Sequence, residues 1–283
     1  MMRLGKYIFF SLLLFALSNM PIFAKELKII QITDSHFATL GQGYSERDVS
    51  DSQSVLEKTI EDINTIKDKD FVIFTGDNID KSNKDELESF LKIANRLNCP
   101  YYIVIGNHEV FKFQHFSKKD YMKTVRKYSK NCRAKNPNYI FEKKGIAFFV
   151  VDGAKEMIPG AAGYFREDTL RQLDKNLKKY EKKGKNVVIF QHFPIVPPYY
   201  NRTHATFDVD GYKNILEKHS NVIAIVSGHY HANGEKLEDG VYHISTPSLL
   251  EYPHNYKVIE IKTQKNHKPR IYTQLRHADV LFW

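Results

Sequence analysis

The first half of the chain alternates short apolar runs with longer stretches in which apolar residues recur at helical spacing. The short runs predict buried strands at 27–33, 71–75 and 101–105, because each is continuous and rich in β-branched or aromatic residues. Helices are predicted between and after them, at 51–67, 85–97 and 117–129. Regular alternation of strand and helix is typical of βα units.

The second half adds a hairpin and a tail made of strands. Apolar runs at 139–142 and 146–152 flank a Lys-Lys-Gly turn, which predicts a hairpin. Further helices are predicted at 166–182 and 211–218, and strands at 186–191, 222–227, 241–245, 256–262 and 270–275. βα units followed by antiparallel strands predict an α/β fold, a four-layer αββα sandwich of two mixed sheets with helices outside.

The body of the chain predicts one domain. No internal repeat or low-complexity linker interrupts residues 25–283, and this length suits a single large α/β domain. One segment, 194–208, is rich in Pro and Tyr and has no periodicity. We expect it to form a loop over the functional site.

Residues 1–24 have the layout of a secretory signal peptide. Arg3 and Lys6 are basic, an apolar run covers 7–18, and a more polar segment ends at Ala24, where cleavage is expected. An uncleaved anchor is the alternative, but the run is shorter than the roughly 20 residues of a membrane-spanning helix. We therefore expect an exported protein (periplasmic, secreted or cell-surface) with no stable membrane span after signal removal.

Charge and cysteine content narrow the range of partners. The 42 Lys and Arg exceed the 33 Asp and Glu, giving a net charge of +9, and the lysines are spread along the chain. A dispersed positive field favours anionic substrates and is weak support for nucleic acid as a partner. Cys99 and Cys132 could form a disulfide in an exported protein, or could be two small buried thiols; both interpretations stay open.

Residues of metal-ligand type follow five of the predicted strands. They are Asp34 with His36, then Asp77, Asn107 and His192, and finally His229 with His231. Each group comes after a β-branched or aromatic run, at the carboxyl end of a strand, where the loops of an α/β sheet converge on a ligand crevice. Within the first and last pairs the residues alternate by two, so both side chains of a pair face one side of an extended chain.

Each of these residues has an ordinary structural explanation when taken alone. Asp77 could cap the next helix, although Ser82 or Asn83 already serves there. Asn107 could be a turn residue, and a lone histidine such as His192 is most often structural. A carboxylate after a buried strand is costly unless it is paired or metal-bound, and paired imidazoles are good ligands for Zn, Mn or Fe. The complete set therefore indicates a metal site.

In this order the segments resemble the motifs of the calcineurin-like metallophosphoesterase family. That pattern is Asp-x-His, Gly-Asp-x-x-Asp, Gly-Asn-His-Glu/Asp, a single His, and Gly-His-x-His, and the resemblance extends from Ile29 to Pro253. It implies two transition-metal ions, either Mn, Fe or Zn. One would be held by Asp34, His36, Asp77 and His231, and the other by Asp77, Asn107, His192 and His229. Asp80 would orient a neighbouring group.

The resemblance also implies a phosphoric ester hydrolase acting on small phosphorylated substrates, either diesters or monoesters. A hydroxide bridging the two ions would attack phosphorus in line, and His108 would assist the departing alkoxide. The motifs contain no nucleophilic side chain, so we expect no covalent intermediate. The turn Thr246-Pro247-Ser248 is similar to that of bacterial members that resemble cyclic-nucleotide phosphodiesterases.

Two other functions stay open at this point. A non-catalytic binding protein could keep this scaffold, although retention of His108 argues against it. An extracellular nuclease would fit the basic charge. Candidate substrate contacts in the 194–208 loop are Tyr199, Tyr200, Asn201, His204 and Phe207, which could equally pack as an ordinary surface loop. The apolar residues 280–283 are expected to dock on the body of the protein.

Overall fold

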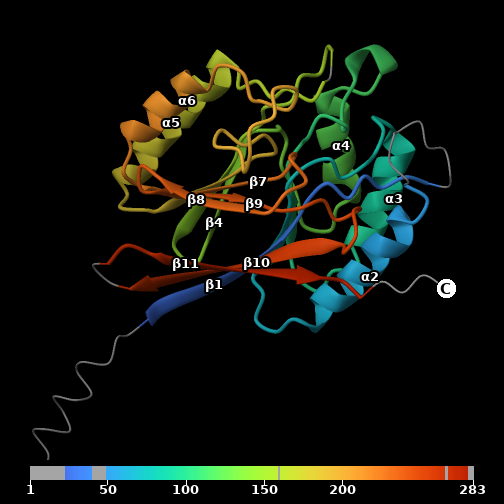
Figure 1. Cartoon of the computed structure of the whole chain (residues 1–283), viewed down its shortest axis with the longest axis horizontal. Coiled ribbons are helices and arrows are strands. Elements are labelled where there is room, and N and C mark those ends of the chain that lie inside the picture. The colour runs from blue at the N-terminus through green and yellow to red at the C-terminus, as the bar shows by residue number, and fades with distance from the viewer. Residues whose placement is uncertain (1–22, 40–48, 159, 265–266, 280–283) are drawn as a thin grey trace, which may run out of the picture.

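Two β-sheets lie face to face at the centre of the molecule, and helices cover the outer face of each (Figure 1). In this computed structural model the described residues are 23–39, 49–158, 160–264 and 267–279. The first sheet contains β1 (Phe23–Ile32), β2 (Phe71–Phe74), β3 (Tyr101–Ile103), β10 (Asn255–Gln264) and β11 (Arg270–His277). The second contains β4 (Tyr139–Lys143), β5 (Ile146–Val150), β6 (Val187–Phe190), β7 (Val222–Ser227), β8 (Gly234–Glu238) and β9 (Val241–Ser245).

Both sheets combine parallel and antiparallel pairs. In the order β11-β10-β1-β2-β3, the three strands β1, β2 and β3 are parallel, and β10 and β11 join them antiparallel. In the order β4-β5-β6-β7-β9-β8, four central strands are parallel and each edge strand is antiparallel to its neighbour. The carboxyl ends of β1, β2, β6 and β7 therefore meet along one side of the sandwich.

Strand residues alternate between two apolar cores. Ile29, Phe71 and Phe148 point between the sheets, where the Phe71 and Phe148 rings lie 5.1 Å apart. The intervening residues, such as Phe74 and Phe149, belong to the larger core under the helices. Because both faces of the central strands are buried, their sequences are apolar throughout instead of alternating with polar residues.

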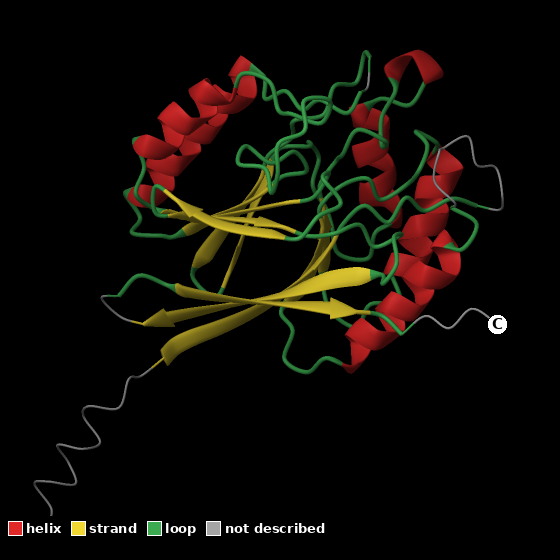
Figure 2. Cartoon of the chain, viewed as in Figure 1, coloured by secondary structure: helices red, strands yellow, loops and turns green. Residues whose placement is uncertain are grey.

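The helices divide between the two outer faces (Figure 2). On the first sheet lie α2 (Ser52–Thr65), α3 (Lys84–Ala94) and α4 (Lys118–Tyr128), and on the second lie α5 (Glu167–Glu181) and α6 (Val209–Glu217). A short 3₁₀ turn, η1 (Lys112–Gln114), precedes α4. Asn83 caps α3 by accepting a hydrogen bond from the backbone N–H of Asp85, so Asp77 is not needed as a cap.

This architecture confirms the predicted sandwich of two mixed sheets with outer helices. The loop predicted at 194–208 is also confirmed up to the start of α6, apart from a single bridge from Phe207 to Tyr164. Strand β8 was missed, because it is a mostly exposed edge strand with no apolar run. Cys99 and Cys132 are both free thiols in the structure.

The ends of the chain leave two predictions open. Most of the predicted signal segment, residues 1–22, and the apolar 280–283 segment lie outside the described residues. Within the described part of the chain, no helix combines the length and apolarity required to cross a bilayer.

Candidate metal centre

Six of the predicted ligands come together as two clusters at the carboxyl ends of β1, β2, β6 and β7. The first cluster consists of Asp34, His36 and His231, and the second of Asp77, His192 and His229. In each cluster, one ligand atom from every residue lies within 4.8 Å of the other two. Residues up to about 200 positions apart in the sequence thus converge because their strands end at the same edge of the sandwich.

In the first cluster, ring nitrogens and a carboxylate oxygen face one common point. His231 Nε2 lies 3.2 Å from Asp34 Oδ1 and 3.4 Å from His36 Nε2. Glu251 Oε1 lies 2.5 Å from the other ring nitrogen of His231, Nδ1. When that carboxylate accepts the Nδ1 hydrogen, a neutral His231 ring keeps its lone pair on Nε2, which is directed toward Asp34 and His36.

In the second cluster, a backbone carbonyl orients the central histidine. His192 Nδ1 lies 2.9 Å from the carbonyl oxygen of Thr75, which can only accept, so Nδ1 carries the hydrogen. His192 Nε2 lies 3.2 Å from both Asp77 Oδ2 and His229 Nδ1. A neutral His192 therefore directs its lone pair to the same space as the other two ligand atoms.

The two clusters are in direct contact with each other. His192 Nε2 of the second cluster lies 4.0 Å from Asp34 Oδ1 of the first. Asp34 Oδ2 accepts a hydrogen bond from the backbone N–H of His229 at 3.1 Å. Asp77 Oδ1 accepts from the backbone N–H of His108 at 2.9 Å, which places the Asn107–His108 turn beside both clusters.

Several buried acceptors at this site lack a hydrogen-bond partner among the described residues. Asn107 Oδ1 is one of them, and Asp34 Oδ1 is another unless His231 Nε2, 3.2 Å away, carries a proton. A buried acceptor without a donor costs free energy, so native proteins rarely leave such groups incomplete. Carboxylate and amide oxygens beside imidazole lone pairs are the donor set of a transition-metal cation, and these residues fit such ions.

The backbone is left-handed at most of the candidate ligands. Asp34, His36, Asp77, His229 and His231 have φ values of 51°, 39°, 49°, 73° and 52°. Residues with positive φ are uncommon outside glycine, and their concentration at one place is typical of a functional site. The sharp exit from each strand turns the side chain inward over the strand ends.

Glycines make room for the ligands at two close approaches. A Cβ atom on Gly106 would lie 2.2 Å from Asp77 Oδ1, inside any normal contact distance. At Gly76, φ is +98° and a Cβ would lie 2.5 Å from His192 Nδ1. These two positions therefore exclude other residue types, which explains why glycine precedes the ligand segment in both motifs.

Buried charges at the centre balance one another. Burial raises the pKa of the Asp34 carboxyl, but His231 and His192 outweigh it and hold that pKa below its usual range. Burial lowers the histidine pKa values, but Asp77 and Asp34 raise that of His192 to about 9, and Asp34 raises that of His231 to about 10. Burial, together with His192, lowers the pKa of His229 to about 3. Without metal, protons on two histidines thus supply the positive charge that the carboxylates need.

His108 lies at the edge of the clusters with one ring nitrogen engaged. Its Nδ1 lies 2.7 Å from the carbonyl oxygen of Asp80, so Nδ1 donates and Nε2 is left for other chemistry. Burial lowers the pKa of His108, but Asp77 and the Asp80 carbonyl outweigh it, so the net direction is upward. The Asp80 carboxylate lies 3.5 Å from His36 Nδ1, where it can orient that ring.

Glu109 supports the centre in a way that the sequence analysis missed. Its fully buried carboxylate accepts hydrogen bonds from the backbone N–H groups of Asp77, Asn78, Ile79 and Gly106. Burial and the charge of Asp77 raise its pKa to about 7. Glu109 therefore ties together the turns after β2 and β3 that carry Asp77 and Asn107. Its place directly after His108 in the motif was the available signal.

A network of neutral side chains lies behind the ligands. Gln31 donates to Thr75 Oγ1 at 2.9 Å and to the carbonyl oxygen of Ser227 at 2.8 Å. Thr246 Oγ1 donates to Gln31 Oε1 at 2.7 Å. This inner network (Gln31, Thr75, Ser227 and Thr246) connects β1 to the ends of β2, β7 and β9. Candidate ligands follow directly after β1, β2 and β7.

The 194–208 loop contributes two of its predicted contacts near the centre. The His204 ring lies 5.1 Å from that of His229, and Tyr199 donates to the carbonyl oxygen of Tyr230 at 3.2 Å. Tyr200 and Phe207 are largely exposed, at 84% and 55%. Contact between any of these residues and a substrate stays a prediction.

Comparison with known proteins gives a consistent picture. The sequence model described as calcineurin-like phosphoesterase matches residues 27–233. A probable glycerophosphodiester phosphodiesterase (GpdQ) of Arcobacter nitrofigilis is 26% identical over 72% of this chain and 71% of its own. A probable cyclic nucleotide phosphodiesterase of Colwellia psychrerythraea is 23% identical over 76% and 73%.

Solved structures share the fold. A dimetal phosphatase from Danio rerio superimposes with a TM-score of 0.65 at 17% identity, over 89% of this chain and 99% of that one. The calcineurin-like phosphoesterase YfkN from Bacillus subtilis gives 0.56 at 14% identity, over 89% and 91%. At these identities the likeness concerns the arrangement of sheets and helices.

Proposed function

The chain belongs to the calcineurin-like phosphoesterase family, a family of metal-dependent phosphoric ester hydrolases, and we propose that it cleaves small phosphodiesters with two bound metal ions. The observation that carries the proposal is the pair of clusters. Each presents a carboxylate and two imidazoles whose ligand atoms lie within 4.8 Å of one another. Two such groups side by side match a site for two cations.

The ligand sets of the two ions are part of this proposal. Asp34, His36 and His231 would hold one ion, and His192, His229 and Asn107 would hold the other. As the family motif implies, Asp77 would serve both; its Oδ2 lies 3.2 Å from His192 Nε2 in the second cluster. When bound, the ions supply a hydroxide derived from water at neutral pH and positive charge for the phosphoryl oxygens.

His108 is the residue that we assign to the leaving group. Its Nδ1 is engaged by the Asp80 carbonyl, so Nε2 is the atom that holds or moves a proton. Asp77 and the Asp80 carbonyl raise the pKa of His108, which is the direction that favours the protonated ring of a general acid. Its backbone N–H is bonded to Asp77, which fixes the ring at the edge of the clusters.

The names of the relatives favour diesters over monoesters. Two are phosphodiesterases by name, and two more, from Danio rerio and Arabidopsis thaliana, are manganese-dependent ADP-ribose/CDP-alcohol diphosphatases, each 28% identical over 32% and 42% of this chain respectively. We therefore take a phosphodiester or diphosphate bond as the substrate class and manganese as the first metal to test.

The test is hydrolysis of bis-p-nitrophenyl phosphate and p-nitrophenyl phosphate by the metal-free and Mn²⁺-loaded protein. We expect metal-dependent turnover that is faster with the diester. His108→Ala should retain its metals but lose about 10²–10⁴-fold in kcat, most for poor leaving groups. The exposed His267 provides a matched control, and His267→Ala should behave like the parent protein.

Two outcomes would replace the proposal. Metal-loaded protein without turnover of any ester would favour the non-catalytic binding protein, and cleavage of plasmid DNA with strong salt dependence would favour the nuclease. Loss of bound metal in His108→Ala would show that His108 is a ligand and not an acid.

We also propose export, with residues 1–24 as a signal peptide and 25–283 as the mature metallophosphoesterase domain. Cleavage after Ala24 would leave Lys25 as the first residue of the mature chain. Lys25 lies in β1 and pairs with Thr263 of β10. N-terminal sequencing of the protein from fractionated cells tests this. A cytoplasmic protein that starts at Met1 would contradict it.

A further inference from the structure

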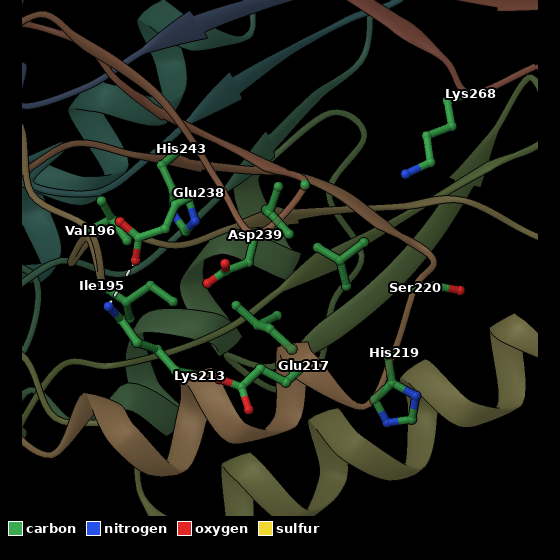
Figure 3. A pocket seen from close by; sticks show the side chains of 14 residues that line it. Ile195, Val196, Lys213, Glu217, His219, Ser220, Glu238, Asp239, His243 and Lys268 are labelled. Atoms are coloured by element: carbon green, nitrogen blue, oxygen red, sulfur yellow. Dashed lines mark hydrogen bonds and ion pairs between the residues drawn. The ribbon is translucent and has the colours of Figure 1, made fainter.

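A second pocket lies away from the metal clusters, between α6 and the turn that joins β8 to β9 (Figure 3). It lies at the amino end of β7, whereas the candidate ligands follow the carboxyl ends of the strands. Its volume is about 130 Å³. This is below the roughly 300–1,000 Å³ typical of sites for drug-sized ligands, so an occupant would be a small molecule.

The pocket has an apolar floor. The side chains of Ile195, Val196, Val222 and Val241 that line it are all less than 10% exposed, and Leu216 of α6 is partly buried beside them. Burying a hydrocarbon body against these residues would provide most of the binding free energy. Polar groups around the floor then determine which ligands are accepted.

His243 and His219 are the buried histidines that line this pocket, and His243 is the one without an acidic partner in hydrogen-bond range. It is 7% exposed and lies on β9, two residues from Val241, so its side chain faces α6. No described residue makes a hydrogen bond to its ring. Burial lowers its pKa to about 4, so it stays neutral and offers an acceptor nitrogen.

Two basic side chains that line the pocket already have acidic partners. Lys213 Nζ lies 2.9 Å from Glu238 Oε1, and Figure 3 shows this pair at one end of the pocket. His219 lies 2.8 Å from Asp174 and 3.3 Å from Glu181.

The remaining charges are mainly negative. Figure 3 shows Glu217 on the helix side and Asp239 on the strand side, and both residues are exposed at the rim. Lys268 is the one lysine left among the lining residues. The pocket thus presents more acceptors than donors around an apolar floor.

We propose that this pocket binds a small organic cation, an ammonium group on a short apolar body. Its N–H groups would donate to the carboxylates of Glu217 and Asp239 and to His243, and its hydrocarbon part would rest on the apolar floor. A carboxylate or phosphate of the same size would be repelled by the carboxylates of Glu217 and Asp239, so it should bind more weakly than the cation. This binding needs neither metal nor phosphoesterase activity, so it can be tested independently of the proposed function.

Benzylamine is a suitable probe, and benzoate is its matched anion. The full metal-free chain with ¹³C-labelled histidines would be titrated with each, and the His243 ring signal, assigned by its absence in His243→Gln, would be followed by NMR. We expect benzylamine to shift this signal with saturation and benzoate to leave it unchanged. Equal binding of both probes, or no shift with benzylamine, would overturn the proposal.

Variants separate charge recognition from simple filling of space. Glu217→Gln combined with Asp239→Asn should weaken benzylamine binding at least tenfold, and asparagine tolerates the φ of 50° at position 239. Glu167→Gln combined with Asp168→Asn, two exposed acids at the start of α5, should change nothing. Both pairs are on the surface, so the fold should be retained, and undiminished binding in the first pair would contradict the proposal.

Discussion

The inner network and the metal clusters are neighbouring layers of buried polar side chains, but they satisfy their hydrogen bonds differently. In the inner network, both polar atoms of the Gln31 amide have protein partners, at 2.7–2.9 Å. One layer outward, Asn107 Oδ1 has no partner among the described residues, and Asp34 Oδ1 has one only when His231 Nε2, 3.2 Å away, carries a proton. These two oxygen atoms and the Gln31 side chain are all buried, so the contrast does not come from access to water.

Chemical composition explains the contrast. Amides and hydroxyls carry both donors and acceptors, so a group of them can complete itself. Carboxylates and neutral imidazole lone pairs only accept, and a layer dominated by them needs a cation or extra protons from outside. The backbone differs as well, since five of the outer residues are left-handed and none of the four inner residues has a positive φ. The inner network, whose hydrogen bonds are satisfied within the protein, holds the strands in place. The clusters, whose acceptors lack donors, remain available to bind metal.

The strongest challenge to this contrast is Asp77→Asn. It removes the charge that serves both clusters, so we expect loss of metal from both and a fall in kcat/KM of more than about 100-fold, the upper end for residues that merely orient a ligand. Metal content of the purified variant and turnover of bis-p-nitrophenyl phosphate measure this.

Strand β2 provides the control. Asp70 is also buried, at the opposite end of β2, where it accepts from the Lys28 backbone N–H at 3.0 Å and from Lys144 Nζ at 2.8 Å. Asp70→Asn should lower thermal stability and leave the metals bound. If the two variants lost equal amounts of metal, the clusters could not be identified as the metal site.

Proton release on metal binding is the next largest effect. With pKa values of about 9 and 10, His192 and His231 hold protons at neutral pH that a metal must displace. Metal affinity should therefore rise with pH by about tenfold per unit for each proton released, and level off above about pH 10. Calorimetric titration with Zn²⁺ at pH 7.5, in buffers of different ionisation enthalpy, counts these protons.

The same two pKa shifts make the stability of the metal-free protein depend on pH. Because both folded-state pKa values are raised, their contribution to stability is complete below about pH 6.5 and is lost as pH rises through 9 to 10. The inner network has no titratable group and should add no slope. His231→Gln should release one proton fewer, and metal binding without proton release would contradict the charge balance described above.

How far the sequence could predict this protein follows from the range of the interactions. Each candidate ligand follows its own strand, so local pattern was enough to place Asp34, Asp77, His192 and His229 at one edge. The structure brings six of the seven together, although metal ligation itself stays a prediction. The sandwich was equally accessible, because its central strands are apolar throughout.

What the sequence did not reveal depends on distant partners. Gln31 has a role only because Thr75, Ser227 and Thr246, at separations of 44 to 215 residues, end beside it. A polar residue within an apolar strand carries no sign of which strands will become its neighbours. Strand β8 was missed for a related reason, since an exposed edge strand needs no apolar pattern.

Breaking the inner network should have a moderate effect. Gln31→Leu keeps the volume but leaves the Thr246 hydroxyl and the Ser227 carbonyl without partners. We expect the free energy of unfolding to fall by about 1–3 kcal/mol, and metal affinity to fall by roughly 10–100-fold as the ligand strands shift. Urea denaturation and metal titration measure the two effects.

A second substitution tests whether unsatisfied groups are the cause. Adding Thr246→Val to Gln31→Leu removes one of the stranded groups, so the double variant should be more stable than Gln31→Leu alone. An additive loss would mean that packing, not hydrogen bonding, makes the inner network important.

The smallest effect is expected at Glu251, where the outer layer meets solvent. Its carboxylate lies 2.5 Å from His231 Nδ1, and its side chain is 50% exposed. Glu251→Gln keeps an oxygen that can accept the Nδ1 hydrogen but removes the charge. Since water can partly replace that charge, we expect metal affinity to fall by no more than about tenfold, the lower end for groups that orient a ligand.

Glu251→Ala sharpens this test, because it removes the acceptor as well as the charge. The loss of affinity should then grow, and only for the metal that His231 holds, so the two ions should dissociate in separate steps on titration with a chelator. Glu167→Gln, at an exposed position on α5, controls for surface charge. If Glu251→Ala released both ions together, His231 and His192 would not belong to separate clusters, and the division of the centre into two sites would have to be abandoned.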